Sequence, residues 1–265
     1  MAKLRGDVKF TGSLGELSFI KRWDLDEIYV RTKGGPSKEE IKTGENFALP
    51  RRYQAEFGSR STAVSHINRV LRWHEPLKDY NFTPGLQGLL SPIQKLDTLG
   101  RLGERTIHFS KGQQLLEGFS LNRRILFESI IRNLVPYTLN KGEGKAQVTI
   151  PSLLPGTNLF VPGNHAAYSI VLTAGLLPDF IYNGKKYIPS IVPDKIPAPV
   201  NERTAWVSCR QASSLQSITL QLDTVPDDGP FCVMIAIGIA FGTLGPTGEI
   251  VQVKRAGAAK ILCVV

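Results

Sequence analysis

Short apolar runs separated by turn residues dominate the second half of the chain. The runs are rich in β-branched and aromatic residues, and Gly, Pro, Asn and Asp gather between them. Within Ser217–Leu222 the pattern alternates, which places Ile218, Leu220 and Leu222 on one face. Many short strands at this spacing predict an antiparallel β-sandwich of immunoglobulin-like, Greek-key type over residues 146–265.

The first half carries a different pattern. Apolar and polar residues alternate over 7–33, which predicts paired strands with their connection near Trp23. Ser37 is placed to cap a short helical turn. Apolar positions over 51–73 recur on one helical face, and a second helical pattern covers 84–104. Pro92 leaves either two short helices or one kinked helix there.

Other segments give weaker signals. Residues 107–139 are mixed, with short strands favoured over helix. Residues 188–203 hold four prolines and are expected to form an extended surface loop. The sequence therefore predicts an α+β protein. It has a basic hairpin-plus-helices region at 1–145 and a β-sandwich domain at 146–265.

The chain closes on an apolar strand. It consists of Ile261, Leu262, Cys263, Val264 and Val265. Such a strand must be buried either in its own sheet or against a neighbouring molecule. We regard it as a candidate assembly strand, and both alternatives remain open from the sequence.

Charge is distributed unevenly along the 265 residues. The net charge is +9, of which residues 1–150 carry +8 (24 basic, 16 acidic) and residues 151–265 carry +1 (8 basic, 7 acidic). A basic first half favours an acidic partner or nucleic acid. No apolar run reaches the roughly 18 residues that cross a bilayer. We therefore expect no membrane span.

The cysteines and the N-terminus indicate a reducing compartment. The three cysteines form no CxxC pair, which disfavours a zinc site or a disulfide framework and favours buried thiols. The first residues lack the apolar region of a secretory signal. We expect synthesis in the cytoplasm, with release by a signal-free route, or inclusion in an extracellular or virion-like particle, left open.

Motifs for catalysis are absent from the sequence. The four histidines show no metal-binding spacing, and neither a nucleophile elbow nor a phosphate loop occurs. The glycine-rich segment 242–248 precedes a strand pattern rather than a helix, so it reads as a turn. We therefore expect a non-enzymatic protein without cofactor or metal.

A basic and aromatic segment is the strongest candidate for an interaction surface. Arg, Trp and Tyr are enriched in protein interfaces, and the same residues can hold phosphates while stacking on bases. The candidate residues are Lys21, Arg22, Trp23, Arg31, Lys33, Arg51, Arg52, Tyr53, Arg60, Arg69, Arg72 and Trp73. Their partner is expected to be another protein surface or nucleic acid.

Several blocks resemble a family of uncharacterised proteins common in Bacteroidota. The blocks are Gly6–Lys21, Val30–Ile41, Glu56-Phe57-Gly58, Leu115–Phe119 and Val148–Ser152. The resemblance covers most of the chain, although Ala258–Val265 is less polar than the family's tail. A similar hairpin followed by a basic strand and helix occurs in phage-associated proteins. The resemblance implies a cytoplasmic, non-enzymatic protein with an assembly role, and it carries over no catalytic residue.

These observations predict a structural protein that assembles with itself into a filament, tube or other multimer. The missing catalytic motifs, the segments 31–50 and 188–203 that could reach a neighbour, and the apolar last strand motivate this expectation. The alternative is a nucleic-acid-binding protein that uses the basic half. Carbohydrate binding by the sandwich, with Trp206 as platform, rests on fold analogy alone.

Overall fold

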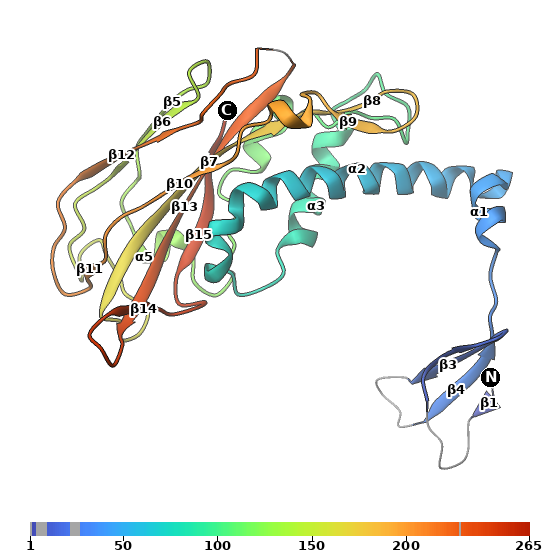
Figure 1. Ribbon diagram of the computed structural model, residues 1–265, viewed down its shortest axis with the longest axis horizontal. Coiled ribbons are helices and arrows are strands. Elements are labelled where there is room, and N and C mark those ends of the chain that lie inside the picture. Colours follow the sequence, from blue (N-terminus) through green and yellow to red (C-terminus); the bar gives the residue numbers. More distant parts are fainter. Residues whose placement is uncertain (1, 4–9, 22–26, 228) are drawn as a thin grey trace. The chain divides into compact units, whose positions relative to one another are not determined.

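The computed structural model describes residues 2–3, 10–21, 27–227 and 229–265. The chain divides into two compact units, Met1–Arg51 and Arg52–Val265. The predicted α+β class is confirmed: a small N-terminal hairpin sheet, a helical region and a C-terminal antiparallel β structure follow one another (Figure 1). The division falls after Arg51, whereas the sequence suggested a boundary after residue 145.

The first unit contains a small antiparallel sheet and a short helix. Its strands are β1 (Ala2–Lys3), β2 (Gly12–Leu14), β3 (Leu17–Lys21) and β4 (Ile28–Thr32), in the order β1-β4-β3-β2. The predicted connection at Trp23 lies outside the described residues.

The short helix of this unit begins where the sequence predicted a capped turn. Helix α1 (Lys38–Thr43) starts after Ser37, whose Oγ accepts a 3.0 Å hydrogen bond from the Glu40 amide. This bond satisfies one of the free amides of the first turn. A 3₁₀ turn, η1 (Glu45–Phe47), follows α1.

A long helix and a shorter one form the helical region. Helix α2 (Ala48–Leu71) buries Val64, Ile67 and Val70 along one face, as the apolar spacing predicted. A 3₁₀ helix, η2 (Arg72–Leu77), continues it through Pro76. Helix α3 (Thr83–Lys95) contains Pro92 in its interior, so the second helical pattern forms one helix rather than two.

Residues 107–139 are mostly irregular, and their regular structure is mainly short helical turns, so the expectation of strands there was largely wrong. The turns are α4 (Phe109–Gly112), η3 (Gln113–Leu115) and α5 (Phe127–Ile130), and strand β5 (Tyr137–Asn140) follows. Distant contacts fix them. The Asp179 carboxylate accepts the Phe109 amide at 2.9 Å, for example.

A six-stranded antiparallel sheet forms the centre of the second unit. Its long strands are β7 (Ala167–Pro178) and β13 (Phe231–Leu244), which pair along their whole length. Shorter strands extend them: β10 (Val200–Arg203) and β11 (Val207–Ser208) pair with β7, and β14 (Ile250–Gln252) and β15 (Ala258–Val264) pair with β13. β7 is buried throughout, which indicates cover on both faces of the sheet.

A second sheet covers one face of the central sheet. It has the order β12-β6-β5, with β6 (Lys145–Ile150) between β5 and β12 (Gln216–Gln221). Val148 of β6 packs in one cluster with Ile170 of β7 and Ile237 of β13. The predicted antiparallel sandwich is therefore present. A separate hairpin, β8 (Phe180–Tyr182) with β9 (Tyr187–Pro189), extends from β7.

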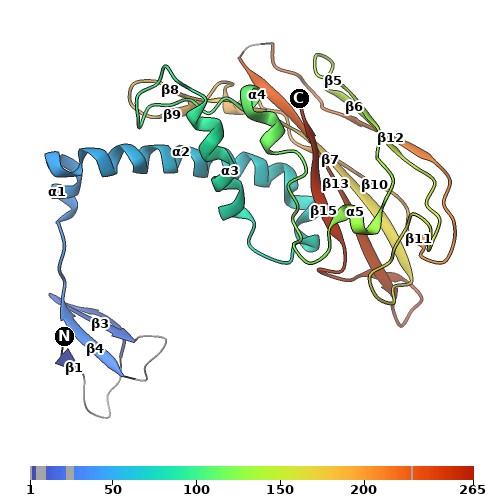
Figure 2. The same ribbon diagram turned by 180° about the vertical axis from the view of Figure 1, so that it is seen from behind.

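Helices cover the opposite face of the central sheet. Ile67 of α2 and Leu90 of α3 lie in one apolar cluster with Met234 of β13. In both views α2 and α3 lie on one side of β7 and β13, and the β12-β6-β5 sheet lies on the other (Figures 1 and 2). The helices thus share an apolar core with the central sheet.

Segment 188–203, one of the two segments expected to reach outward, is folded onto this unit, whereas segment 31–50 belongs to the first unit. In 188–203, Ile191 and Ile196 are buried, η4 (Pro193–Lys195) forms a turn, and β10 pairs with β7. The expectation of an extended surface loop was wrong for Val200–Arg203, which form an edge strand. Segment 31–50 is not extended either, since it contains α1 and η1.

The apolar last strand is buried in its own sheet, the first of the two alternatives. β15 pairs with β13 on one edge, and on the other the Gly118 amide donates to the Ile261 carbonyl and the Ile261 amide to that of Phe119. Both edges of the strand therefore have partners within the chain. Ile261, Cys263 and Val264 are fully buried, while Leu262 is half-buried and Val265 is exposed.

None of the helices in the described part of the chain is long and apolar enough to cross a membrane.

Candidate functional site

The predicted basic and aromatic residues are divided between the two units. Lys21, Arg31 and Lys33 lie on the surface of the first unit, at the ends of β3 and β4. Arg22 and Trp23 lie outside the described residues. The candidates from Arg52 onward belong to the second unit.

Three of the predicted arginines hold the fold together. Arg51 Nη1 donates to the carbonyls of Ile41 and Gly44, both at 2.8 Å. Arg60 Nη1 donates to Gln94 Oε1 at 2.7 Å, and Arg69 Nη2 donates to the Pro197 carbonyl at 2.8 Å. These hydrogen bonds occupy donors that a ligand would need.

Arg72 and Trp73 lie together at the start of η2. The Arg72 guanidinium lies 4.3 Å from the Trp73 ring centroid, a cation–π contact. Arg72 is exposed, whereas Trp73 is half-buried. Arg52 and Tyr53 are exposed nearer the N-terminal end of α2.

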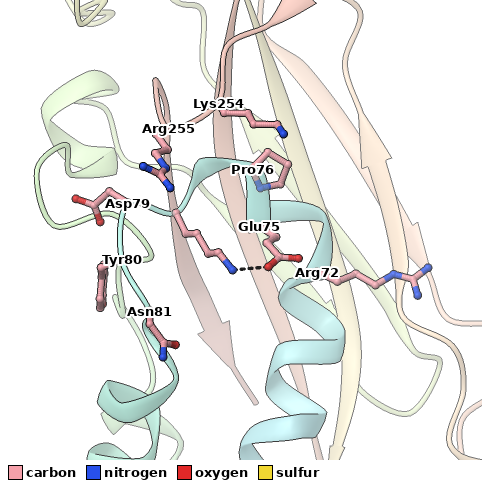
Figure 3. A pocket seen from close by; sticks show the side chains of 9 residues that line it. Arg72, Glu75, Pro76, Asp79, Tyr80, Asn81, Lys254 and Arg255 are labelled. Atoms are coloured by element: carbon pink, nitrogen blue, oxygen red, sulfur yellow. Dashed lines mark hydrogen bonds and ion pairs between the residues drawn. The ribbon is translucent and has the colours of Figure 1, made fainter. Parts of the chain in front are cut away.

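A cavity of about 640 Å³ opens beside Arg72. It lies between η2, the segment that follows it, and the turn between β14 and β15 (Figure 3). This volume lies within the usual range of small-molecule sites. The lining residues are Arg72, Glu75, Pro76, Lys78, Asp79, Tyr80, Asn81, Lys254 and Arg255.

The two acidic residues of this cavity already have partners. Glu75 forms an ion pair with Lys78, drawn as the dashed line in Figure 3. Asp79 accepts the backbone amides of Arg123 at 3.0 Å and Arg124 at 3.2 Å. The lining as a whole holds four cations and two carboxylates, a net charge of +2, so the cavity presents a positive potential.

The turn that carries Lys254 and Arg255 is held against η2. The Arg255 amide donates a 2.8 Å hydrogen bond to the Pro76 carbonyl. Arg255 has φ of 64°, the one positive value at a non-glycine position among the described residues. This left-handed conformation costs an arginine about 1 kcal/mol. A strained backbone therefore places a cation at the cavity.

Of the cavity cations Arg72, Lys254 and Arg255, only Arg72 belongs to the basic segment predicted from the sequence. Lys254 and Arg255 lie far from the basic segment and fall within the weakly charged second half. The available signal was the Lys-Arg pair followed by Ala256-Gly257, which is typical of an exposed turn. Nothing in the sequence indicated that this turn would pack against Pro76.

A second cluster of titratable groups is built from His108 and Asp179. Their Nδ1 and Oδ2 atoms lie 3.0 Å apart, and Asp179 is fully buried. Burial raises the pKa of Asp179, while hydrogen bonds from His108 and the Phe109 amide oppose that shift. Among the described residues, no hydroxyl or thiol is hydrogen-bonded to the His108 ring. The pair anchors the start of α4 to the end of β7.

The described residues contain no group of three or more His, Cys, Asp or Glu side chains placed to hold a metal ion. Cys209, Cys232 and Cys263 are buried free thiols, as the sequence predicted. Burial raises their pKa to about 11, 11 and 12 respectively, which keeps them protonated at neutral pH.

No family model, curated protein or solved structure matches the chain.

Proposed function

We propose that this protein is a structural protein that assembles with copies of itself through the small sheet of its first unit. One observation carries the proposal: among the described residues, the sheet has an apolar face on which Phe10, Leu14 and Leu17 stay exposed. Phe19 and Ile28 are the buried apolar side chains among the described residues of this unit. Two such side chains are too few to stabilise a sheet without further packing.

The exposed apolar face follows from the strand register. Leu14 of β2 lies opposite Leu17 of β3, and Phe19 lies on the same face two residues farther on. The side chains of Leu14 and Leu17 are 64% and 39% exposed. Phe10 packs its ring 4.3 Å from that of Phe19 and is itself 40% exposed. The face is thus a continuous apolar surface.

Charge favours a second copy as the occupant of this face. Residues 1–51 carry ten basic and eight acidic side chains, a net of +2, whereas 52–265 carry 22 and 15, a net of +7. The basic and acidic side chains of the first unit nearly cancel, so copies that meet through it can place opposite charges against one another. The strand β2 also ends the sheet with an edge that could pair with the same edge of a neighbour.

The linker supports an arm-like role for the sheet. Residues 33–37, which join β4 to α1, are all exposed. A segment without buried side chains leaves a small element free to dock on a neighbouring subunit. Binding of nucleic acid by the whole basic segment has less support, because Arg51, Arg60 and Arg69 make hydrogen bonds within the chain.

The test is the mass and shape of the purified, untagged protein. Light scattering after size exclusion and negative-stain electron microscopy are compared for the wild-type chain and for Leu14→Ser/Leu17→Ser. We expect regular multimers from the wild type and monomers from the variant, because serine removes the apolar surface while Phe19 and Ile28 stay in place.

A matched control makes the same change elsewhere. Leu215 and Leu244 are 63% and 66% exposed in the second unit, so Leu215→Ser/Leu244→Ser removes equivalent side chains. This variant should assemble like the wild type. A wild-type chain that stays monomeric at high concentration, or a Leu14/Leu17 variant that assembles unchanged, would overturn the proposal.

A further inference from the structure

We propose that the cavity beside Arg72 binds single-stranded nucleic acid, with Lys254 and Arg255 holding a backbone phosphate. This site differs from the basic segment predicted by sequence, since two of its cations come from the turn after β14. The proposal is independent of self-assembly, because all its residues belong to the second unit.

The charge balance of the cavity favours an anion. Glu75 is paired with Lys78 and Asp79 with two backbone amides, so both negative groups are occupied. Within the described part of the chain, no carboxylate forms an ion pair with Arg72, Lys254 or Arg255. Unpaired cations around a concave site attract a phosphate group more strongly than the same charges on a flat surface do.

The backbone of the turn is fixed in a way that serves this role. Arg255 is held at φ of 64° by packing and by its hydrogen bond to the Pro76 carbonyl. Gly257, two residues later, cannot accept a side chain, since an added Cβ would lie 1.9 Å from the Ile239 carbonyl oxygen. The backbone of the turn is therefore held against η2, which places Arg255 beside the cavity before any ligand arrives.

The lining also offers groups for a base. Tyr80 is fixed by its hydroxyl, which donates to the Ser120 carbonyl at 3.0 Å, and by Arg123, whose guanidinium lies 3.9 Å from the ring centroid. The neighbouring Asn81 carries an amide that both donates and accepts hydrogen bonds. Figure 3 shows Lys254 and Arg255 near one end of the cavity and Tyr80 and Asn81 toward the other.

A second cavity extends the first and favours a chain-like ligand. This smaller hollow, of about 170 Å³, shares Arg72, Glu75, Lys78 and Asn81 with the larger one and continues toward Asn68 and Thr83. The two form a groove longer than one phosphate needs. Successive nucleotides of a single strand fit a positive groove with an aromatic side chain.

The test is fluorescence anisotropy of a 5′-labelled oligothymidine with the full chain at several salt concentrations. In Lys254→Ala/Arg255→Gly, glycine adopts the φ of 64° without strain, so the turn is kept. We expect binding at low salt to weaken at least about tenfold and the slope of log K against log salt to become shallower by about 0.7, the value for one phosphate of a single strand. The control, Lys185→Ala/Lys186→Ala, removes the same charge at an exposed turn and should change affinity less than about twofold.

Competition experiments identify the ligand, and a second variant covers the case in which the first variant misfolds. AMP and inorganic phosphate should compete only at much higher concentration than unlabelled oligothymidine, and poly-glutamate should compete poorly. If the double variant fails to fold by circular dichroism, Arg72→Gln replaces it and should weaken binding at least about threefold. Absence of wild-type binding, equal loss in the control, or equal competition by AMP or by poly-glutamate would overturn the proposal.

Discussion

Arg60 donates a 2.7 Å hydrogen bond from its Nη1 to Oε1 of Gln94, which joins α2 to α3 in the interior of the second unit. Gln94 is fully buried, and its Nε2 donates in turn to Ser59 Oγ at 3.0 Å and to the Arg105 carbonyl at 2.9 Å. The buried carboxylate of Glu56 lies 3.9 Å from Arg60. A cation that the sequence assigned to an interface thus completes a polar network.

Loss of Arg60 should destabilise the protein. Arg60→Ala removes the donor to Gln94 Oε1. Among the described residues it leaves Glu56 with Arg105, at 3.7 Å, as its only ionic partner. Removing one member of a buried polar network costs about 2–4 kcal/mol. Urea unfolding followed by circular dichroism measures this loss in the free energy of unfolding. Arg52→Ala, at an exposed position on the same helix, should change the free energy of unfolding by less than about 0.5 kcal/mol. Equal effects of the two changes would contradict the assignment.

The buried His74 should make stability fall in mild acid. Burial lowers its pKa to about 3; Nε2 lies 3.1 Å from Thr173 Oγ1, and Nδ1 has no partner. A histidine in the unfolded chain has a pKa near 6.5. Below about pH 6.5 the unfolded state therefore binds a proton that the folded state does not. The contribution of His74 to the free energy of unfolding is complete above that pH. It falls by about 1.4 kcal/mol per pH unit as the pH is lowered toward 3.

The variant His74→Gln removes this titration. The stability difference between the wild type and the variant should shrink by about 2 kcal/mol between pH 7.5 and pH 5, whatever its value at neutral pH. Denaturant unfolding at each pH gives the difference. If the variant does not fold, the ring signals of His74 in the wild type should show no titration between pH 7.5 and pH 5 in NMR spectra. A constant difference, or a titration near pH 6, would show that the ring is accessible to protons.

Two glycine positions should respond to alanine in opposite ways. A Cβ at Gly238 of β13 would lie 2.7 Å from both His74 Nδ1 and Leu77 Cδ1, so Gly238→Ala should cost about 1–3 kcal/mol. At Gly58 of α2 nothing lies within 4 Å of the added atom, and alanine favours a helix interior. Gly58→Ala should therefore stabilise the protein by about 0.5–1 kcal/mol. Thermal unfolding measures both, and a shift of the same sign would contradict the packing described.

The three thiols should be unreactive in the folded protein. Cys209, Cys232 and Cys263 are buried, and burial raises the pKa of each. At pH 8 a thiol reagent such as dithionitrobenzoate should modify none of them within minutes. All three should react once urea unfolds the chain. Rapid reaction of one thiol in the native protein would show that its strand opens locally.

Local sequence patterns determined the fold class, the hairpin sheet, the capped turn at Ser37 and the helix that became α2. These features depend on spacing along a short stretch of chain, so hydrophobic periodicity and capping residues suffice to predict them. The run Phe231–Phe241 was likewise evident as a strand. Its burial on both faces was not, because periodicity does not tell which elements pack on a fully apolar strand.

Tertiary structure alone decided the turns of 107–139, the pairing of Val200–Arg203 with β7, and the cover of β15 by residues 118–121. Each depends on contacts between residues far apart in the sequence, which local propensity does not encode. The same reason explains why the roles of Arg60 and Arg255 were not predicted from the sequence. Arg60 became an internal hydrogen-bond donor and Arg255 a cavity side chain, because the packing of α3 and of the β14–β15 turn places their partners. The sequence specifies the type of each charged residue. Whether its side chain contacts water, a ligand or a buried amide depends on the fold.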